Sequence, residues 1–249
     1  MSIEQRSTAR PRSRRERIGE LVGRAAAPLF YAIARARRAR VFHPEGIVLV
    51  ARVEPLGASP IAESLRGPAL VRFSTALWKH GKEWPDALGC AIRFRSTAAP
   101  SAEPEPGDQD LLFATIRTPL ATPFAPVGTH VHDFLANTYF ATAPFDVRGV
   151  GRAKWRVVPE RIGASRERDR DARLLGAVER GDAALRLELR RTFRRAWTPV
   201  ARVVLEHAAD VDQARLRFWP FRAGRGIRPR GFVHALRRGA YAASQAARP

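Results

Sequence analysis

Cysteine and lysine are nearly absent from this chain, and it has no long apolar run. Cys90 is the only cysteine in 249 residues, which excludes an intrachain disulfide and a CxxC metal site. No stretch suits a secretory signal or a membrane-spanning helix, because Glu20, Arg24 and Pro28 interrupt the apolar residues of 18–33. We therefore expect a cytoplasmic protein.

The positive charge is carried almost entirely by arginine. The formal net charge is +20, although Lys79, Lys82 and Lys154 are the only lysines. A charge of this size suits nucleic acid or an anionic membrane as a partner. The arginines are nevertheless scattered along the sequence, and no helix-turn-helix, RNA-recognition or zinc-finger signature accompanies them. We expect a broadly basic, solvated surface and no specific nucleic-acid binding.

The hydrophobic pattern divides the chain into two predicted domains. Residues 1–40 combine a basic arm with an amphipathic helix, which suits a membrane surface, the chain's own barrel or a second subunit of a homo-oligomer. Residues 41–249 are rich in β-type segments, with helical patches near 129–140, 170–180 and 231–247. The β-type segments are 47–53, 69–75, 90–96, 110–116, 152–158, 185–190, 202–206 and 214–218.

These eight segments predict an α+β fold. Short strands separated by turn residues are typical of an antiparallel barrel or sandwich. We expect an antiparallel eight-stranded β-barrel with flanking N-terminal and C-terminal helices.

One pair of residues near the C-terminus has the spacing of partners on a helix. Arg237 precedes Tyr241 by four residues, in an alanine-rich stretch that follows a break at Pro229 and Gly231. A guanidinium beside a phenol favours the charged phenolate. Phenolate is one of the few protein ligands of haem iron. The pair predicts a haem ligand if other segments supply the opposite side of a haem.

Three earlier segments supply that side. They are RVFHPEG (40–46), VRFST (71–75) and DALGCAIRF (86–94). In this order they resemble the distal half of the haem catalases, whose pattern is R-x-x-H-x-x-G, V-R-F-S-T and D-x-x-G-x-A-x-(basic)-F. The C-terminal stretch is similar to the proximal helix of small catalase-related proteins, where R-x-x-x-Y supplies the iron ligand. The resemblance implies a catalase-like barrel with haem b, Tyr241 as iron ligand and Arg237 tuning its phenolate.

The resemblance also implies roles for four residues on the distal side. His43 would act as general base and then as general acid toward peroxide, and Ser74 would hydrogen-bond its far nitrogen. Arg40 and Arg72 would neutralise the haem propionates. Taken singly, each of these residues would be an ordinary histidine before a strand or the polar face of a strand. Their joint order along the chain is what favours haem.

The segment DLLFATI (110–116) departs from the catalase pattern. Full catalases carry D-L-x-G-N-N-T-P there, with an asparagine over the iron, whereas this chain has none. Thr115 could donate a weaker hydrogen bond from a similar position. Leu88 also replaces the arginine usual in D-x-R-G, and the chain is too short for an expected NADPH site.

These departures favour a peroxidase over an efficient catalase. We expect peroxide-dependent oxidation, with hydrogen peroxide or an organic hydroperoxide and a small reducing co-substrate, and weak true catalase activity. One alternative is a haem-free barrel that binds a lipid or another anionic ligand through its arginines. A second is a haem enzyme that rearranges fatty-acid hydroperoxides.

Overall fold

The computed structural model describes residues 46–78, 81–118, 127–161 and 167–235, together with positions 14, 17, 18 and 21. Contacts between residues divide the chain into two compact units, residues 1–41 with 229–249, and residues 42–228. The barrel belongs to the second unit. The domain boundary predicted after residue 40 stays a prediction.

The described secondary structure is mostly β. The elements are β1 (Gly46–Pro55), α2 (Pro60–Leu65), β2 (Gly67–Thr75), β3 (Leu88–Phe94), β4 (Gln109–Ala114), η3 (Phe134–Ala136), β5 (Tyr139–Phe140), β6 (Phe145–Val147), β7 (Gly151–Arg161), α3 (Arg170–Glu179), β8 (Ala183–Arg191), β9 (Thr198–Ala208) and β10 (Ile227–Pro229). Residues 232–235 are helical, and the rest of the helix predicted at 231–247 lies outside the described residues. So does most of the helix predicted within 1–40.

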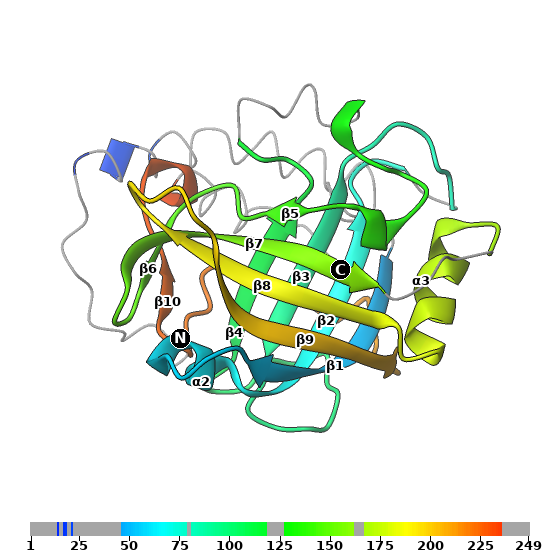
Figure 1. Cartoon of the computed structure of the whole chain (residues 1–249), viewed down its shortest axis with the longest axis horizontal. Coiled ribbons are helices and arrows are strands. Elements are labelled where there is room, and N and C mark those ends of the chain that lie inside the picture. The colour runs from blue at the N-terminus through cyan, green and yellow to red at the C-terminus, as the bar shows by residue number, and fades with distance from the viewer. Residues whose placement is uncertain are drawn as a thin grey trace. The chain divides into compact units, whose positions relative to one another are not determined.

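Eight of the described strands close into an antiparallel barrel (Figure 1). The order around the barrel is β7, β5, β4, β3, β2, β1, β9 and β8, and β8 pairs back onto β7. A closed barrel leaves no free edge among these strands. The predicted α+β fold with an antiparallel eight-stranded barrel is confirmed.

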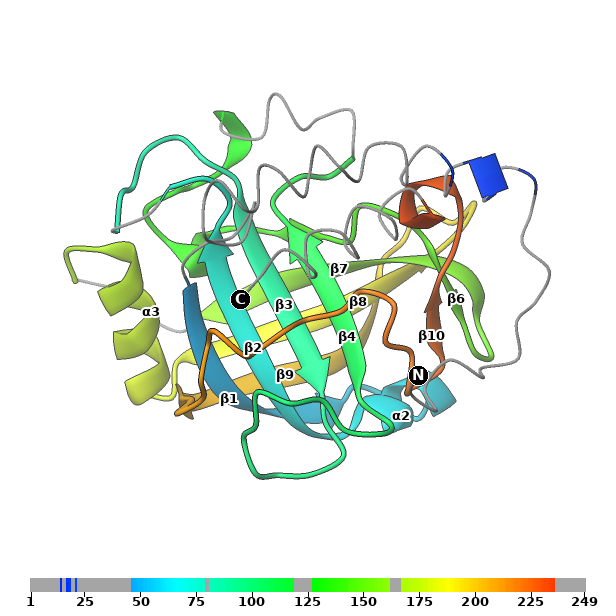
Figure 2. The same ribbon diagram turned by 180° about the vertical axis from the view of Figure 1, so that it is seen from behind.

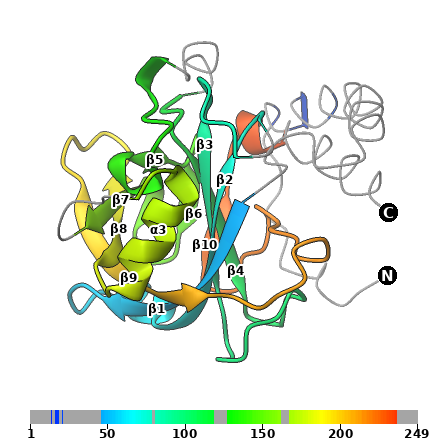
Figure 3. The same ribbon diagram turned by 90° about the vertical axis from the view of Figure 1, so that its right-hand side faces the viewer.

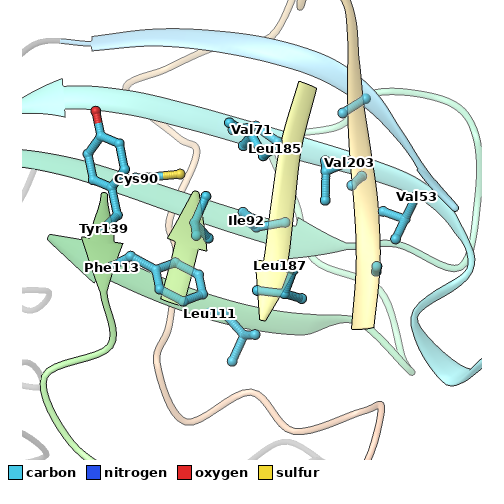
Figure 4. Close-up of a cluster of buried hydrophobic side chains, with 14 of the residues drawn as sticks. Val53, Val71, Cys90, Ile92, Leu111, Phe113, Tyr139, Leu185, Leu187 and Val203 are labelled. Carbon is cyan, nitrogen blue, oxygen red and sulfur yellow. The ribbon is translucent and has the colours of Figure 1, made fainter. Parts of the chain in front are cut away.

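Apolar side chains fill the inside of the barrel. Neighbouring strands are in register, so that Leu49, Val71, Ile92 and Leu111 form one inward-facing row across β1–β4. Opposite strands contribute Leu185, Leu187 and Val203, which point into the same interior (Figure 4). Burying each such side chain contributes about 1.5–3 kcal/mol. A slip of one residue would turn a whole row outward, so this pattern specifies the register.

Two short helices are capped by their own sequences. Asp169 begins α3, with its carboxylate accepting a hydrogen bond from the Ala172 amide at 2.8 Å. Leu174 and Val178 of α3 are buried in the core, and Figure 3 shows α3 beside β8 and β9. Ser59 caps α2 in the same way. No helix among the described residues has the length and apolar character needed to cross a membrane.

The stretch predicted as a helix at 129–140 is instead a short 3₁₀ turn followed by β5. The Asn137 side chain ends the turn, because its amide nitrogen donates to the His130 carbonyl at 2.9 Å and to the Asp133 carbonyl at 2.7 Å. Tyr139 and Phe140 then pair with β7 and provide the eighth strand of the barrel.

The strand predicted at 214–218 does not form. Asp212 holds a turn there, with its side chain accepting from the Ala214 amide at 2.8 Å and its carbonyl accepting from the Leu216 amide at 2.9 Å. Leu216 and Phe218 are still buried, and this explains the strand-like alternation of the sequence. The other seven predicted strands are present as β1, β2, β3, β4, β7, β8 and β9.

Candidate functional site

The outer face of β1–β4 carries the distal segments that the sequence singled out (Figure 2). Strand register sets three rows of outward-facing residues across these four strands. The row at the start of β1 contains only small residues, and we call it the small-residue row. It consists of Gly46, Ser74, Gly89 and Ala114; the second row is Val48, Arg72, Ala91 and Leu112; the third is Val50, Leu70, Arg93 and Asp110.

Four separate segments of the sequence meet in the small-residue row. Gly46 ends RVFHPEG, Ser74 belongs to VRFST, Gly89 to DALGCAIRF, and Ala114 to DLLFATI. Residues far apart in the chain thus form one flat strip on the sheet. With no side chain beyond a hydroxymethyl group, this strip allows a flat molecule to approach the backbone closely.

The guanidinium of Arg72 reaches toward the small-residue row. A Cβ added to Gly46 would overlap the Phe73 carbonyl oxygen and would lie 2.9 Å from Ser74 Cβ and 3.0 Å from Arg72 Nη2, so the backbone of β2 leaves room only for glycine. Arg72 is 5% exposed and Ser74 is 3% exposed. The structure therefore brings these two predicted site residues together around Gly46. Arg72 therefore brings a permanently charged guanidinium to this end of the sheet.

Residues 209–222 cross the second and third rows after β9 (Figure 2). Leu216 and Phe218 of this segment form an apolar cluster with Val48 and Leu70 on the outer face of the barrel. The outer face of β1–β4 is therefore buried in these rows and not solvated.

Asp110 holds the covering segment to the barrel. Its buried carboxylate accepts hydrogen bonds from Arg93 Nε at 2.9 Å and from the Trp219 amide at 2.7 Å, and it also pairs with Arg222. Arg93 in turn donates to the Arg217 carbonyl. Two guanidinium groups thus meet one carboxylate, which leaves this cluster positively charged, like the Arg72 position in the next row.

Ala114, and not Thr115, lies in the small-residue row. The hydroxyl of Thr115 accepts a hydrogen bond from the Leu88 amide at 3.1 Å and bonds with Thr129 Oγ1 at 2.7 Å. The Thr115 amide donates to the Leu88 carbonyl at 2.9 Å. Thr115 thus closes the end of the β3–β4 ladder, and the structure does not bring it together with Arg72 and Ser74. Its predicted catalytic role stays a prediction.

The remaining predicted site residues lie outside the described residues. They are Arg40, His43, Arg237 and Tyr241. His43 precedes Gly46 by three residues in the sequence, and Gly46 pairs with Ser74.

A small cavity of about 20 Å³ borders Gly46. Thr75, Trp78, Phe134 and Arg170 also line it, and its size suits one molecule as large as water. Arg170 is 3% exposed, and its buried Nε has no hydrogen-bond partner among the described residues. Arg170 Nε lies 3.7 Å from Asp171 Oδ1, so a guanidinium and a carboxylate both border the cavity next to the start of β1.

The outer face of β7–β9 is different, because ion pairs cover it. Arg186 Nε donates to Glu188 at 2.7 Å, and Arg202 Nε donates to Glu160 at 3.3 Å. Trp197 packs between the guanidinium groups of Arg156 and Arg190. Except for Glu188, these charged side chains are partly exposed, as expected for a solvated surface.

The solved structure of a fungal catalase is similar to this chain, with a TM-score of 0.56 and 13% sequence identity. The fold is catalase-like. The match covers 87% of this chain and 61% of the fungal catalase, so the chain spans about three fifths of that protein's length. No family model matches the sequence, and no curated protein matches it.

Sequence reasoning found Arg72 and Ser74 in this catalase-like barrel but missed the parts played by Gly46, Gly89 and Ala114. The two glycines are part of the motifs R-x-x-H-x-x-G and D-x-x-G. Their position side by side follows only from the strand register, which brings them into one row. Ala114 carried no signal of its own in the sequence.

Proposed function

We propose that this chain binds haem b against the small-residue row and works as a peroxidase. Its substrates would be hydrogen peroxide or an organic hydroperoxide, together with a small reducing co-substrate. The observation that carries the proposal is the meeting of four sequence segments in one flat row beside Arg72.

The residues present fit a haem. A porphyrin is flat and apolar with two carboxylates at one edge, and it needs a surface without projecting side chains. Gly46, Gly89 and Ala114 would provide such a surface, because none of them carries a side chain larger than a methyl group. The buried guanidinium of Arg72 suits a carboxylate, and Arg40 would provide a second.

His43 would transfer the peroxide proton, and Ser74 would orient His43. The imidazole of His43 would accept a proton from one peroxide oxygen and return it to the oxygen that leaves. The Ser74 hydroxyl would hold the other ring nitrogen of His43, which fixes the tautomer and the orientation of the ring. Haem iron, when bound, would supply the redox chemistry that cleaves the O–O bond.

Tyr241 and Arg237 would form the opposite side. The Tyr241 oxygen would bind the iron as a phenolate, and the Arg237 guanidinium would keep that oxygen ionised. A spacing of four residues on a helix allows this contact.

The methyl group of Ala114 supports peroxidase activity over efficient catalase activity. It occupies a place in the small-residue row from which a carboxamide could donate a hydrogen bond to peroxide. Without that donor, the oxygen-releasing half of catalase turnover is expected to be slow. The reducing co-substrate, a homo-oligomeric state and a cytoplasmic location stay predictions.

Titration of the purified full-length chain with haemin tests the proposal. We expect a saturable Soret band, which Tyr241→Phe abolishes or shifts, because the phenolate ligand is lost. His43→Ala should keep the band and lose peroxide-dependent oxidation of a dye. Ser74→Ala should lower that rate less. A colourless protein that takes up no haemin would contradict the proposal and favour the haem-free binding of a lipid or another anionic ligand.

If haem binds, a fatty-acid hydroperoxide and hydrogen peroxide should be compared as substrates. Oxidation of the dye supports the peroxidase. Conversion of the fatty-acid hydroperoxide without oxidation of the dye would point to the rearranging enzyme instead.

A further inference from the structure

The turn between β8 and β9, residues 192–197, presents a fully exposed phenyl ring. Phe193 is completely solvent-exposed, and its φ is 69°. It is the only non-glycine residue with positive φ among those the structure describes. A bulky residue rarely adopts this conformation, and glycine or asparagine would suit the turn better. The ring is not buried in the fold, which makes Phe193 a candidate for contact with a partner.

Basic side chains surround Phe193. The local sequence is RRTFRRAW (190–197), and strand register places Lys154 and Ala153 of β7 opposite Arg190 and Arg191. The Thr192 hydroxyl donates to the Arg152 carbonyl at 3.0 Å, which brings a further basic residue to the turn. The basic residues of the turn region are Arg152, Lys154, Arg190, Arg191, Arg194 and Arg195.

None of these six side chains forms a salt bridge with a described residue. Few acidic residues lie near the turn, and one of them pairs with arginines outside it. Glu188 pairs with Arg156 and Arg186, and Asp146 lies opposite Arg152 on β6. Farther along β7 and β8, Arg156 and Arg186 pair with Glu188 and Glu160, so positive and negative charges balance there. The turn therefore carries an unbalanced positive charge around one apolar tip.

This arrangement fits an anionic lipid surface better than a nucleic acid. Proteins that bind single-stranded nucleic acid stack successive bases on several aromatic rings. Here the second ring, Trp197, already stacks with the guanidinium groups of Arg156 at 4.6 Å and Arg190 at 4.8 Å, so Phe193 is the one fully exposed ring of the turn. A bilayer surface instead accepts an apolar side chain below its phosphates and arginines at the phosphates.

We propose that the β8–β9 turn docks this protein on anionic phospholipid membranes. Phe193 enters the interface between headgroups and acyl chains, and Arg194 and Arg195 contact lipid phosphates. This goes beyond the peroxidase proposal and does not depend on haem, because every residue involved lies in the barrel hairpin and the test reads binding alone.

Co-sedimentation of the full-length chain with vesicles tests the proposal. We expect binding to vesicles of phosphatidylglycerol and phosphatidylcholine in equal parts, and little binding to phosphatidylcholine alone. Phe193→Gly should weaken binding at least about tenfold, because a phenyl ring leaves the apolar phase. The same variant should unfold at an equal or higher denaturant concentration, since glycine adopts positive φ without strain. A purely structural role for Phe193 would lower that concentration instead.

Two further variants separate the ring from the charge. Phe193→Trp should retain binding, and its fluorescence emission should shift to the blue when anionic vesicles are added. The double variant Arg194→Gln with Arg195→Gln should bind about 25-fold more weakly, since each basic residue near an anionic surface contributes about fivefold. The matched control, Arg66→Gln with Arg215→Gln, removes the same charge from other exposed positions and should bind nearly as the wild type does.

Three results would overturn the proposal. The first is equal binding of Phe193→Gly and the wild type to anionic vesicles. The second is an equal loss in the two double-glutamine variants, which would mean that only total charge matters. The third is a chain that ignores vesicles but uses Phe193 to bind single-stranded RNA or a second copy of itself, measured by fluorescence anisotropy and by sedimentation.

Discussion

The two halves of the barrel share an apolar interior and differ on the outside. On the outer face of β7–β9, strands alternate between buried residues and partly exposed charged ones such as Arg186 and Arg202. On the outer face of β1–β4, β2 is buried at every position from Ala69 to Thr75, on both faces. An antiparallel strand that is buried on both faces has something covering its outer side.

The outer face of β1–β4 is covered by another part of the chain, whereas the outer face of β7–β9 is solvated. Residues 209–222 account for the cover over the second and third rows, through Leu216, Phe218 and the Asp110 cluster. The small-residue row lies beyond them and is flat, with the Arg72 guanidinium beside Gly46. The contrast between a solvated, charge-balanced face and a buried face that carries Arg72 is the physical reason for proposing haem on one side only.

The largest expected difference between the two faces is in their acidic residues. Asp110→Asn should lower the free energy of unfolding by about 3–5 kcal/mol, because it leaves the buried guanidinium of Arg93 without its carboxylate. Glu160→Gln, on the solvated face, should cost less than about 1 kcal/mol. Urea denaturation measures both. Similar losses in the two variants would contradict the distinction between a buried and a solvated face.

A smaller effect is expected from the interior that both halves share. Burial raises the pKa of the Cys90 thiol and of the Tyr139 phenol, so both groups are neutral in the fold. The unfolded chain ionises them near their ordinary values of 9.0 and 10.0. The contribution of these two groups to stability should therefore be constant below about pH 9 and fall above it, by about 1–2 kcal/mol at about pH 10.

Urea denaturation across that pH range provides the measurement. Cys90→Ala should flatten the first part of the decline, since the thiol ionises before the phenol does. Stability that rises between about pH 9 and about pH 10 would contradict this account. So would a decline that Cys90→Ala leaves unchanged, because the buried thiol would then not be its cause.

The third prediction concerns activity on the outer face of β1–β4. Ala114→Asn adds a carboxamide to the small-residue row and should raise oxygen release from hydrogen peroxide roughly tenfold, the effect of about 1.4 kcal/mol on the barrier. Thr115→Asn adds the same group one residue later, where the hydroxyl closes the β3–β4 ladder. It should give no gain in oxygen release and should lower stability. A gain in the Thr115 variant alone would reassign the distal position.

Seven of the eight barrel strands could be predicted, because their segments are rich in β-type residues and are bounded by turn residues. Leu185, Leu187 and Leu189 alternate with charged residues, and β8 follows directly from that pattern. Strand β5 could not be predicted, since two residues carry no period of their own and the strand is defined by its pairing with β4 and β7. The reverse holds at 214–218, where an alternating pattern reflects burial against β1 and β2 without strand pairing.

Some residues of the candidate site could likewise be predicted from sequence, and others could not. The motif order was enough to predict Arg72 and Ser74, which the structure places around Gly46. The choice between Ala114 and Thr115 could not be made from sequence, because Leu111, Leu112 and Phe113 are apolar in succession and hide which face each residue takes. Register with β3 was needed to place Ala114 in the row.

The most direct test of the central claim compares one bulky substitution on each outer face. Ala114→Phe places a ring on the small-residue row, and Val204→Phe places one on the outer side of β9, opposite Arg52. The binding of haemin, followed by its absorption, should weaken at least about tenfold in Ala114→Phe and stay close to wild type in Val204→Phe. Equal haemin affinity in the two variants would contradict the assignment of haem to this face.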